Sequence, residues 1–159
     1  MKPSPTRNES PTPAPGGAEI RSFATQHVRY GWWALLVFLT LGLVLESLHG
    51  FKVGAYLNLN NETRRLTWTL AHAHGALLGI VLIVFGLTAR NWPQWDLRQR
   101  SLAGRSLKAA TLLIPGGFFL GGLFAKGGDP GLGILLVPIG GVLLFIGVLL
   151  TGLQAGRAE

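Results

Sequence analysis

Ionisable side chains lie in the first two apolar stretches of this sequence, where they call for an explanation. Glu46 and His49 end the first stretch, and His72 and His74 lie in the second, LTWTLAHAHGALLGIVLIVFGL, residues 66–87. Ionisable groups inside a membrane are costly, so they usually have a partner or a function. Imidazole is a ligand for haem iron, copper and zinc, and a carboxylate can hold the second nitrogen of such a histidine. These four residues are therefore the candidate chemistry of the chain.

Helical spacing separates the two histidines of the second stretch. Residues two apart on a helix diverge by about 200°, so His72 and His74 are not expected to bind one ion together. His72 shares a stripe with Gly75 and Gly79, which predicts that it faces other helices. His74 points roughly the other way, towards lipid, another subunit or a ligand.

The polar residues of the two stretches are at compatible depths. Glu46 and His49 are three residues apart and share a helix face with Gly42. At 1.5 Å per residue, Glu46 lies about 6 Å and His72 about 9 Å inside the outer ends of their helices. We therefore expect Glu46, His49 and His72 to meet between the helices. Arg64 and Arg65 should lie above them, able to pair with Glu46 or with an anionic ligand.

Two interpretations of this cluster stay open at the level of sequence. In the structural one, Glu46 and His72 form an interhelical hydrogen bond. In the functional one, His72, His49, His74 and Glu46 form a cofactor site, with His72 and His49 as the metal ligands. The E-x-x-H spacing of Glu46 and His49 also occurs in carboxylate di-iron proteins, but the further carboxylates of that pattern are missing here.

The elements that must position these residues are four long apolar runs. They span residues 30–50, 66–89, 107–125 and 131–153. Each has roughly the twenty residues that a helix needs to cross a bilayer. The sequence therefore predicts an all-α polytopic membrane protein, a bundle of four transmembrane helices in contact with the lipid bilayer.

The remaining segments are assigned by composition. Residues 1–22 are rich in Pro, Ser and Thr and predict a disordered tail, which leaves residues 23–156 as the membrane domain. His27 precedes the first apolar run, so we expect a solvated or interfacial side chain. The loop after residue 89 predicts a short surface helix at the membrane interface. The sequence KGGDPG, residues 126–131, predicts a tight turn.

Glycines at helical spacing predict the faces on which the helices pack. Small residues let membrane helices approach closely. The candidate packing positions are Gly42, Gly75, Gly79, Gly117, Gly121, Gly133, Gly140 and Gly147. Pro115 and Pro138 are expected to kink the third and fourth helices. A homo-oligomer or a place in a larger membrane complex is the expected assembly.

The charge distribution predicts the orientation. Of the 14 Lys and Arg residues, ten lie in the two tails and the second loop, and four in the first and third loops. The positive-inside rule then places both termini in the cytoplasm, in a bacterial inner (plasma) membrane. The net charge of +7 follows from this topology, so no nucleic-acid partner is expected. The absence of cysteine excludes disulfides and thiolate ligands.

Residues 30–90 carry a resemblance. The second stretch reads L-A-H-A-H-G-x-L-L-G-x-x-x-x-x-F-G and resembles small four-helix membrane proteins related to haem–copper oxidase subunit I. It is also similar to the second helix of subunit I, where a T-A-H-A or T-A-H-G element carries a low-spin haem ligand. The resemblance implies that His72 binds the iron of haem b. A second ligand would come from His49, from His74 or from another copy of the chain.

The resemblance also limits the expected function. The late helices that carry the copper ligands of subunit I are absent, so this chain alone is not expected to reduce oxygen or to be an enzyme. The leading hypothesis is a small accessory protein of a bacterial respiratory or electron-transfer system. The alternatives are a structural or assembly subunit, whose polar residues only fasten helices, and a small-solute carrier. The carrier is disfavoured because polar residues occupy one hairpin alone.

Overall fold

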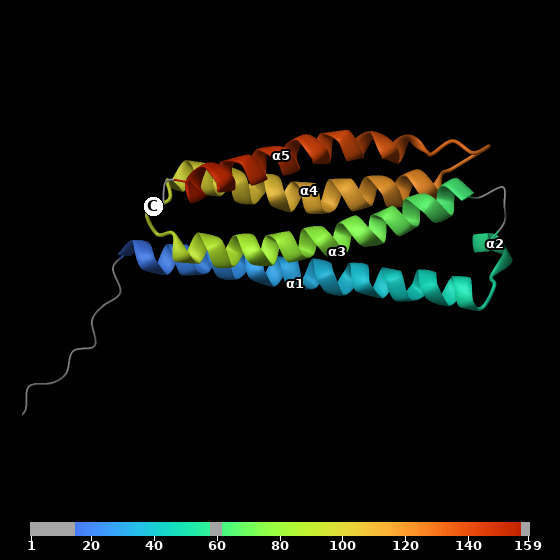
Figure 1. Cartoon of the computed structure of the whole chain (residues 1–159), viewed down its shortest axis with the longest axis horizontal. Helices are drawn as coiled ribbons and strands as arrows, with labels where there is room; N and C mark the ends of the chain where they lie inside the picture. The colour runs from blue at the N-terminus through green and yellow to red at the C-terminus, as the bar shows by residue number, and fades with distance from the viewer. Residues whose placement is uncertain (1–14, 58–61, 157–159) are drawn as a thin grey trace, which may run out of the picture.

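A computed structural model describes residues 15–57 and 62–156 of the chain, and all the regular elements there are helices (Figure 1). Within these two ranges, four segments are long and apolar enough to cross a membrane, which agrees with the predicted all-α, multi-pass protein. The elements are α1 (Pro15–Gly50), α2 (Gly54–Leu57), α3 (Glu62–Asn91), α4 (Leu97–Leu123), the 3-10 helix η2 (Leu132–Leu135) and α5 (Leu136–Ala155).

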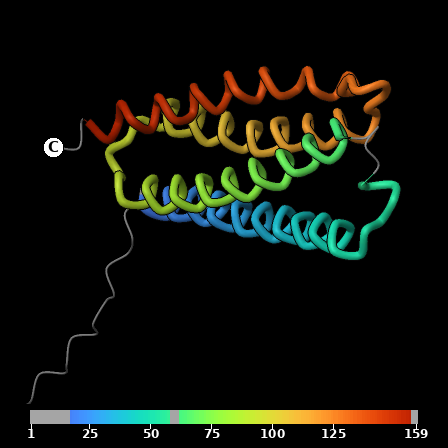
Figure 2. The backbone as a smooth tube through the Cα atoms, turned by 45° about the vertical axis from the view of Figure 1, so that its right-hand side comes forward, coloured from blue at the N-terminus to red at the C-terminus, as the bar shows by residue number. Residues whose placement is uncertain are grey.

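The long helices pack in chain order. α1 packs on α3, α3 on α4, and α4 on α5 (Figures 1 and 2). The central helices α3 and α4 are better buried than α1 and α5. In an 18-residue apolar stretch of each helix, 39% of the residues are buried in α3 and 50% in α4, against 11% in α1 and in α5. The outer faces of α1 and α5 therefore stay uncovered, with large side chains such as Leu43 and Phe145 exposed.

The two ends of the molecule differ. At one end, which we call the base, α1 begins, α3 connects to α4, and α5 ends (Figure 1). At the other, which we call the crown, α1 ends, α2 lies, α3 begins and α4 turns into η2 (Figure 1). Residues 15 and 156 both lie at the base, as an even number of spanning helices requires.

The first helix is longer than its apolar run. α1 begins at Pro15, so the predicted tail is wrong for residues 15–22, while residues 1–14 lie outside the described part. Proline is favoured in the first turn of a helix, where its missing N–H is not needed. Contacts hold this extension in place, because Ala24 is buried and Val28 and Ala24 lie against Gly86 of α3. Tertiary packing, which composition does not reveal, makes these polar residues helical.

The predicted surface helix after residue 89 is instead the start of α4, which runs unbroken from Leu97 to Leu123. Asp96 caps it, with the carboxylate accepting hydrogen bonds from the backbone of Arg98 (3.1 Å) and Gln99 (2.9 Å). The first turns bury Ala103 and Leu107 against the other helices, which explains why this segment does not lie flat on a surface.

The predicted tight turn is confirmed. Lys126 and Asp129 exchange two backbone hydrogen bonds of 3.0 Å. Between them, Gly127 and Gly128 have φ of 59° and 92°, a left-handed pair that glycine adopts without strain. In the following segment, Pro138 lies in the first turn of α5, where it interrupts no helical hydrogen bond.

Glycines mark the closest approaches between helices. A Cβ on Gly31 would lie 2.6 Å from the carbonyl oxygen of Gly79, so α1 and α3 touch there through their backbones. A Cβ on Gly140 would lie 2.6 Å from Ile114, and one on Gly147 2.7 Å from Leu107, so α5 packs tightly on α4. Gly117 and Gly133 make similarly close contacts, whereas a Cβ on Gly121 would meet Ile134 at an ordinary 3.6 Å.

Candidate functional site

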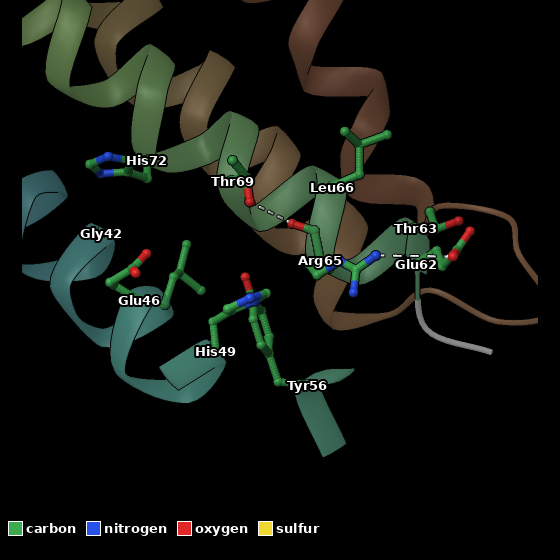
Figure 3. A pocket seen from close by; sticks show the side chains of 11 residues that line it. Gly42, Glu46, His49, Tyr56, Glu62, Thr63, Arg65, Leu66, Thr69 and His72 are labelled. Atoms are coloured by element: carbon green, nitrogen blue, oxygen red, sulfur yellow. Dashed lines mark hydrogen bonds and ion pairs between the residues drawn. The ribbon is translucent and has the colours of Figure 1, made fainter. Parts of the chain in front are cut away.

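A cavity of about 750 Å³ lies at the crown, between the end of α1, the short α2 and the beginning of α3 (Figure 3). Its lining combines apolar, hydroxyl, basic and acidic side chains. They belong to Gly42, Leu45, Glu46, His49, Tyr56, Glu62, Thr63, Arg65, Leu66, Thr69 and His72. The structure thus brings together Glu46, His49 and His72, the three residues predicted to meet.

The cavity exists because α1 and α3 diverge towards the crown (Figure 1). They touch at Gly31 and Gly79, and further along two aromatic rings fill glycine gaps: Phe38 lies over Gly75 and His72 lies over Gly42. Beyond His72 the widening space is the cavity, which Leu45 and Glu46 line from α1 and Leu66 and Thr69 line from α3. At each of these two contacts, a ring of one helix fills the gap at a glycine of the other helix. The two contacts therefore form the floor of the cavity.

His72 is held in one orientation. Its Nδ1 lies 2.7 Å from the backbone oxygen of Phe38 on α1. A carbonyl only accepts, so Nδ1 carries the proton and Nε2 of the neutral ring keeps its lone pair. A helical side chain leans over the preceding turn, so a side chain at position 42 would cover this carbonyl. Gly42 leaves it open, and a Cβ there would overlap the His72 ring.

Glu46 and His49 lie one and two turns beyond Gly42, and both face the cavity (Figure 3). Both side chains are exposed rather than locked. The hydrogen bond predicted between Glu46 and His72 is wrong, because His72 bonds to the Phe38 carbonyl instead. The peptide oxygen reaches the ring because Gly42 exposes it, and this was not evident from side-chain spacing.

Arg64 and Arg65 were both predicted to lie above the cluster, but their side chains point in different directions. Arg65 lines the cavity and forms a long ion pair of 4.0 Å with Glu62, not with Glu46. Arg64 turns towards α4, where its Nε donates to the carbonyl of Gly122 at 3.1 Å and its guanidinium lies 5.9 Å from the Trp68 ring. Arg64 therefore does not belong to the site.

An aromatic stack, which was not predicted from the sequence, supports the wall of the cavity. Tyr56 of α2 is only 6% exposed and stacks on Trp68 of α3 at 6.5 Å, which stacks on Phe119 of α4 at 5.5 Å. The Trp68 Nε1 also donates to the Phe119 carbonyl at 3.1 Å. The signal was weak, because Tyr56 stands in a loop without periodicity. The stack ties α2 to the helices behind it.

His74 is not part of this cavity. Its Nδ1 donates to the carbonyl of Leu70 in its own helix at 2.9 Å, and its ring lies 5.1 Å from that of Phe118 on α4. The predicted divergence of His72 and His74 is therefore confirmed. The neighbour of His74 within the chain is Phe118 of α4, and the side chain is only partly buried.

The described residues offer few ligands for a bare metal ion. Across residues 15–57 and 62–156, no three His, Asp or Glu side chains converge in an arrangement that could hold one. His72 and His49 line the same cavity, so an ion there would have at most two imidazole ligands and the Glu46 carboxylate nearby. A cofactor that brings its own ligands suits this site better.

A second polar cluster lies at the base, and it corrects the prediction for His27. That side chain is only 1% exposed, not solvated, because it packs between Phe85 of α3 and Gly104 of α4. Arg100 is 3% exposed and lies over the Phe23 ring at 5.2 Å. Among the described residues, the His27 Nε2, the Trp95 Nε1 and an Arg100 nitrogen are buried without a hydrogen-bond partner.

Comparisons with known proteins add no relative: no protein-family model matches the chain, and no curated protein and no solved structure is significantly similar to it. The relation to proteins of the haem–copper oxidase type therefore stays a prediction.

Proposed function

We propose that this chain is a small accessory protein of a bacterial respiratory or electron-transfer membrane system, and that it binds haem b in the crown cavity through Nε2 of His72. The observation that carries the proposal is the hydrogen bond from the His72 Nδ1 to the Phe38 carbonyl. Histidines that bind metals almost always donate their other ring N–H to a carbonyl or carboxylate in this way.

Haem is favoured over a bare ion by the ligand count. A porphyrin supplies four nitrogens, so the protein needs to add only one or two axial ligands. His72 is the fixed one, and His49 in the same cavity is the candidate for the second. When bound, haem would supply a one-electron redox couple, which is the chemistry that an electron-transfer system requires.

The cavity also suits such a ligand in size and lining. Its 750 Å³ lies within the roughly 300–1,000 Å³ typical of cofactor pockets. Leu45 and Leu66 offer apolar contact to a flat ring, while Arg65 and Tyr56 offer donors to carboxylate substituents. Glu46 stands beside His72 as the group that could accept a proton or a hydrogen bond from the ligand.

The assembly and orientation belong to the same proposal. The positive-inside rule places the base, with both termini, in the cytoplasm and the crown cavity on the outer side of the inner membrane. The uncovered outer faces of α1 and α5 favour contact with lipid, with a second copy or with a larger membrane complex.

Absorption spectroscopy of the detergent-purified, haem-reconstituted protein tests the proposal. We expect a Soret band that disappears in His72→Ala. The matched control is His74→Ala, which removes a histidine two residues away on the opposite face and should leave the band in place. Wild-type protein that stays colourless after haem addition, or a band that persists in His72→Ala, would refute haem binding at this site.

A structural or assembly subunit is the second candidate, because the His72–Phe38 hydrogen bond joins α1 to α3 whether or not a ligand binds. Interhelical hydrogen bonds in membrane bundles contribute about 0.6 kcal/mol on average. This alternative predicts that His72→Ala lowers thermal stability slightly and that haem addition changes neither the stability nor the spectrum of the wild type.

A further inference from the structure

We propose that the groove between the middle parts of α1 and α4 binds one anionic phospholipid, with an acyl chain in the groove and the lipid phosphate on Lys108, on the base side of the groove. The proposal rests on the four helices spanning a membrane, and it is independent of haem binding at the crown. The groove and the crown cavity share no lining residue, although Phe38, which lines the groove, also accepts the hydrogen bond from His72.

The groove has a volume of about 240 Å³ and is almost wholly apolar. Tyr30, Trp33 and Val37 of α1 form one wall, and Leu112 of α4 forms the other. It exists because α1 and α4 do not pack on each other along their length; both pack on α3 instead. A narrow apolar groove between two membrane helices has the shape of an acyl chain.

Lys108 bridges α4 and α1 on the base side of this groove. It precedes Leu112 by one helical turn, and its Nζ donates to the side-chain oxygen of Gln26 at 2.9 Å. Gln26 in turn precedes Tyr30 by one turn. The amide orients the ammonium group across the gap between α1 and α4 but does not neutralise it. The half-buried charge of Lys108 therefore lacks a counter-ion among the described residues.

The surroundings of Lys108 are basic. Arg105 lies three residues before Lys108 on α4, and Arg29 lies three residues after Gln26 on α1; both are exposed. Arg100 is enclosed further towards the base along the same two helices. The nearest carboxylate on this face of α1 is Glu19, seven residues or about 10 Å from Gln26. In the described part of the chain, the sole ion pair is Arg65–Glu62 at the crown.

The level of the site in the membrane selects the ligand. Tyr and Trp side chains such as Tyr30 and Trp33 are enriched where acyl chains meet headgroups. A lysine there extends its ammonium group to the phosphate level. Basic pockets between membrane helices hold anionic lipid headgroups, and a phosphate with an attached acyl chain matches the lysine and groove together.

Fluorescence quenching by brominated lipids tests the proposal. The protein is reconstituted in vesicles that contain either phosphatidylglycerol or phosphatidylcholine with the same brominated chains, and the Trp33 signal is isolated by subtracting Trp33→Phe. We expect phosphatidylglycerol to occupy the groove with a preference of about fivefold, as for one basic residue near the surface. Lys108→Gln should abolish the preference, and Lys108→Arg should retain it.

The controls make each outcome decisive. Lys126→Gln is the same change at an exposed lysine of the crown and should leave the preference intact. Equal quenching by both lipids would overturn the proposal, as would equal losses in Lys108→Gln and Lys126→Gln. Loss of the preference on addition of soluble glycerol phosphate would show a free-phosphate site instead. Protection of Trp33 from both lipids would show that a second copy of the chain covers the groove.

Discussion

The position of the His72 ring depends on the missing side chain of Gly42. The ring occupies the space that a Cβ would take, and its Nδ1 reaches a carbonyl that such a side chain would cover. Phe38, which supplies that carbonyl, in turn places its own ring in the gap left by Gly75. Two glycines and two rings therefore fix the floor of the crown cavity.

Gly42→Ala should weaken haem binding without unfolding the protein. The new methyl group displaces the His72 ring and breaks its hydrogen bond to Phe38. Loss of such a supporting bond typically lowers metal affinity about 10- to 100-fold. Haem titration followed by the Soret band measures the change.

The matched control for Gly42→Ala is Gly50→Ala. Gly50 lies at the end of the same helix, and a Cβ there would have no heavy atom within 4 Å. Its substitution should leave haem affinity unchanged. Equal affinity in Gly42→Ala and the wild type would show that His72 does not need this orientation, and would remove the main support for its role as a ligand.

At the scale of the helices, α4 and α5 pack closely because large side chains of one helix lie against glycines of the other. Gly140 lies against Ile114 and Leu113, whereas its neighbour Gly141 faces open space. Two adjacent glycines therefore have opposite environments, which offers an internal comparison of packing with helix propensity.

Gly140→Ala should destabilise the protein, whereas Gly141→Ala should be neutral or stabilising. A Cβ at position 140 would lie 2.6 Å from Ile114 and would push α5 away from α4. At position 141 alanine meets nothing and gains up to about 1 kcal/mol of helix propensity. Thermal unfolding of both variants in the same detergent measures the difference. Equal effects of the two substitutions would contradict the helix packing described for α4 and α5.

The helices could be predicted from the sequence because their apolar runs are long and continuous, but two of their ends could not. Residues 15–22 and 97–106 are polar enough to suggest a tail and a surface helix. They are helical because Ala24, His27 and Gly104 close the contact between α1, α3 and α4. The sequence suggested a solvated His27 because the residues that bury it belong to other helices, α3 and α4.

The candidate site was predictable in part. Helical spacing and depth brought Glu46, His49 and His72 to one place and separated His74 from them. The partner of His72 could not be read from side chains, because it is a peptide carbonyl exposed by a glycine. Tyr56 and the stack behind it depend on the path of a loop between α1 and α3.

At the scale of the whole molecule, the crown and the base have different electrostatic character. The crown cavity contains two carboxylates, Glu46 and Glu62, beside its basic groups, whereas the base carries a surplus of Lys and Arg. The inner leaflet of a bacterial membrane is where the positive-inside rule places such a surplus. The orientation of the chain in the membrane therefore decides both the side on which the crown cavity opens and the leaflet that supplies the lipid.

Thiol labelling tests this orientation, because the chain has no cysteine of its own. Ala55 in α2 at the crown and Gln94 between α3 and α4 at the base are both exposed and uncharged. With a membrane-impermeant maleimide, Ala55→Cys should react in intact spheroplasts, and Gln94→Cys only after permeabilisation. The reverse pattern would place the crown cavity on the cytoplasmic side. It would also put the basic groove in the outer leaflet of the membrane, where the charge surplus would no longer be explained by topology.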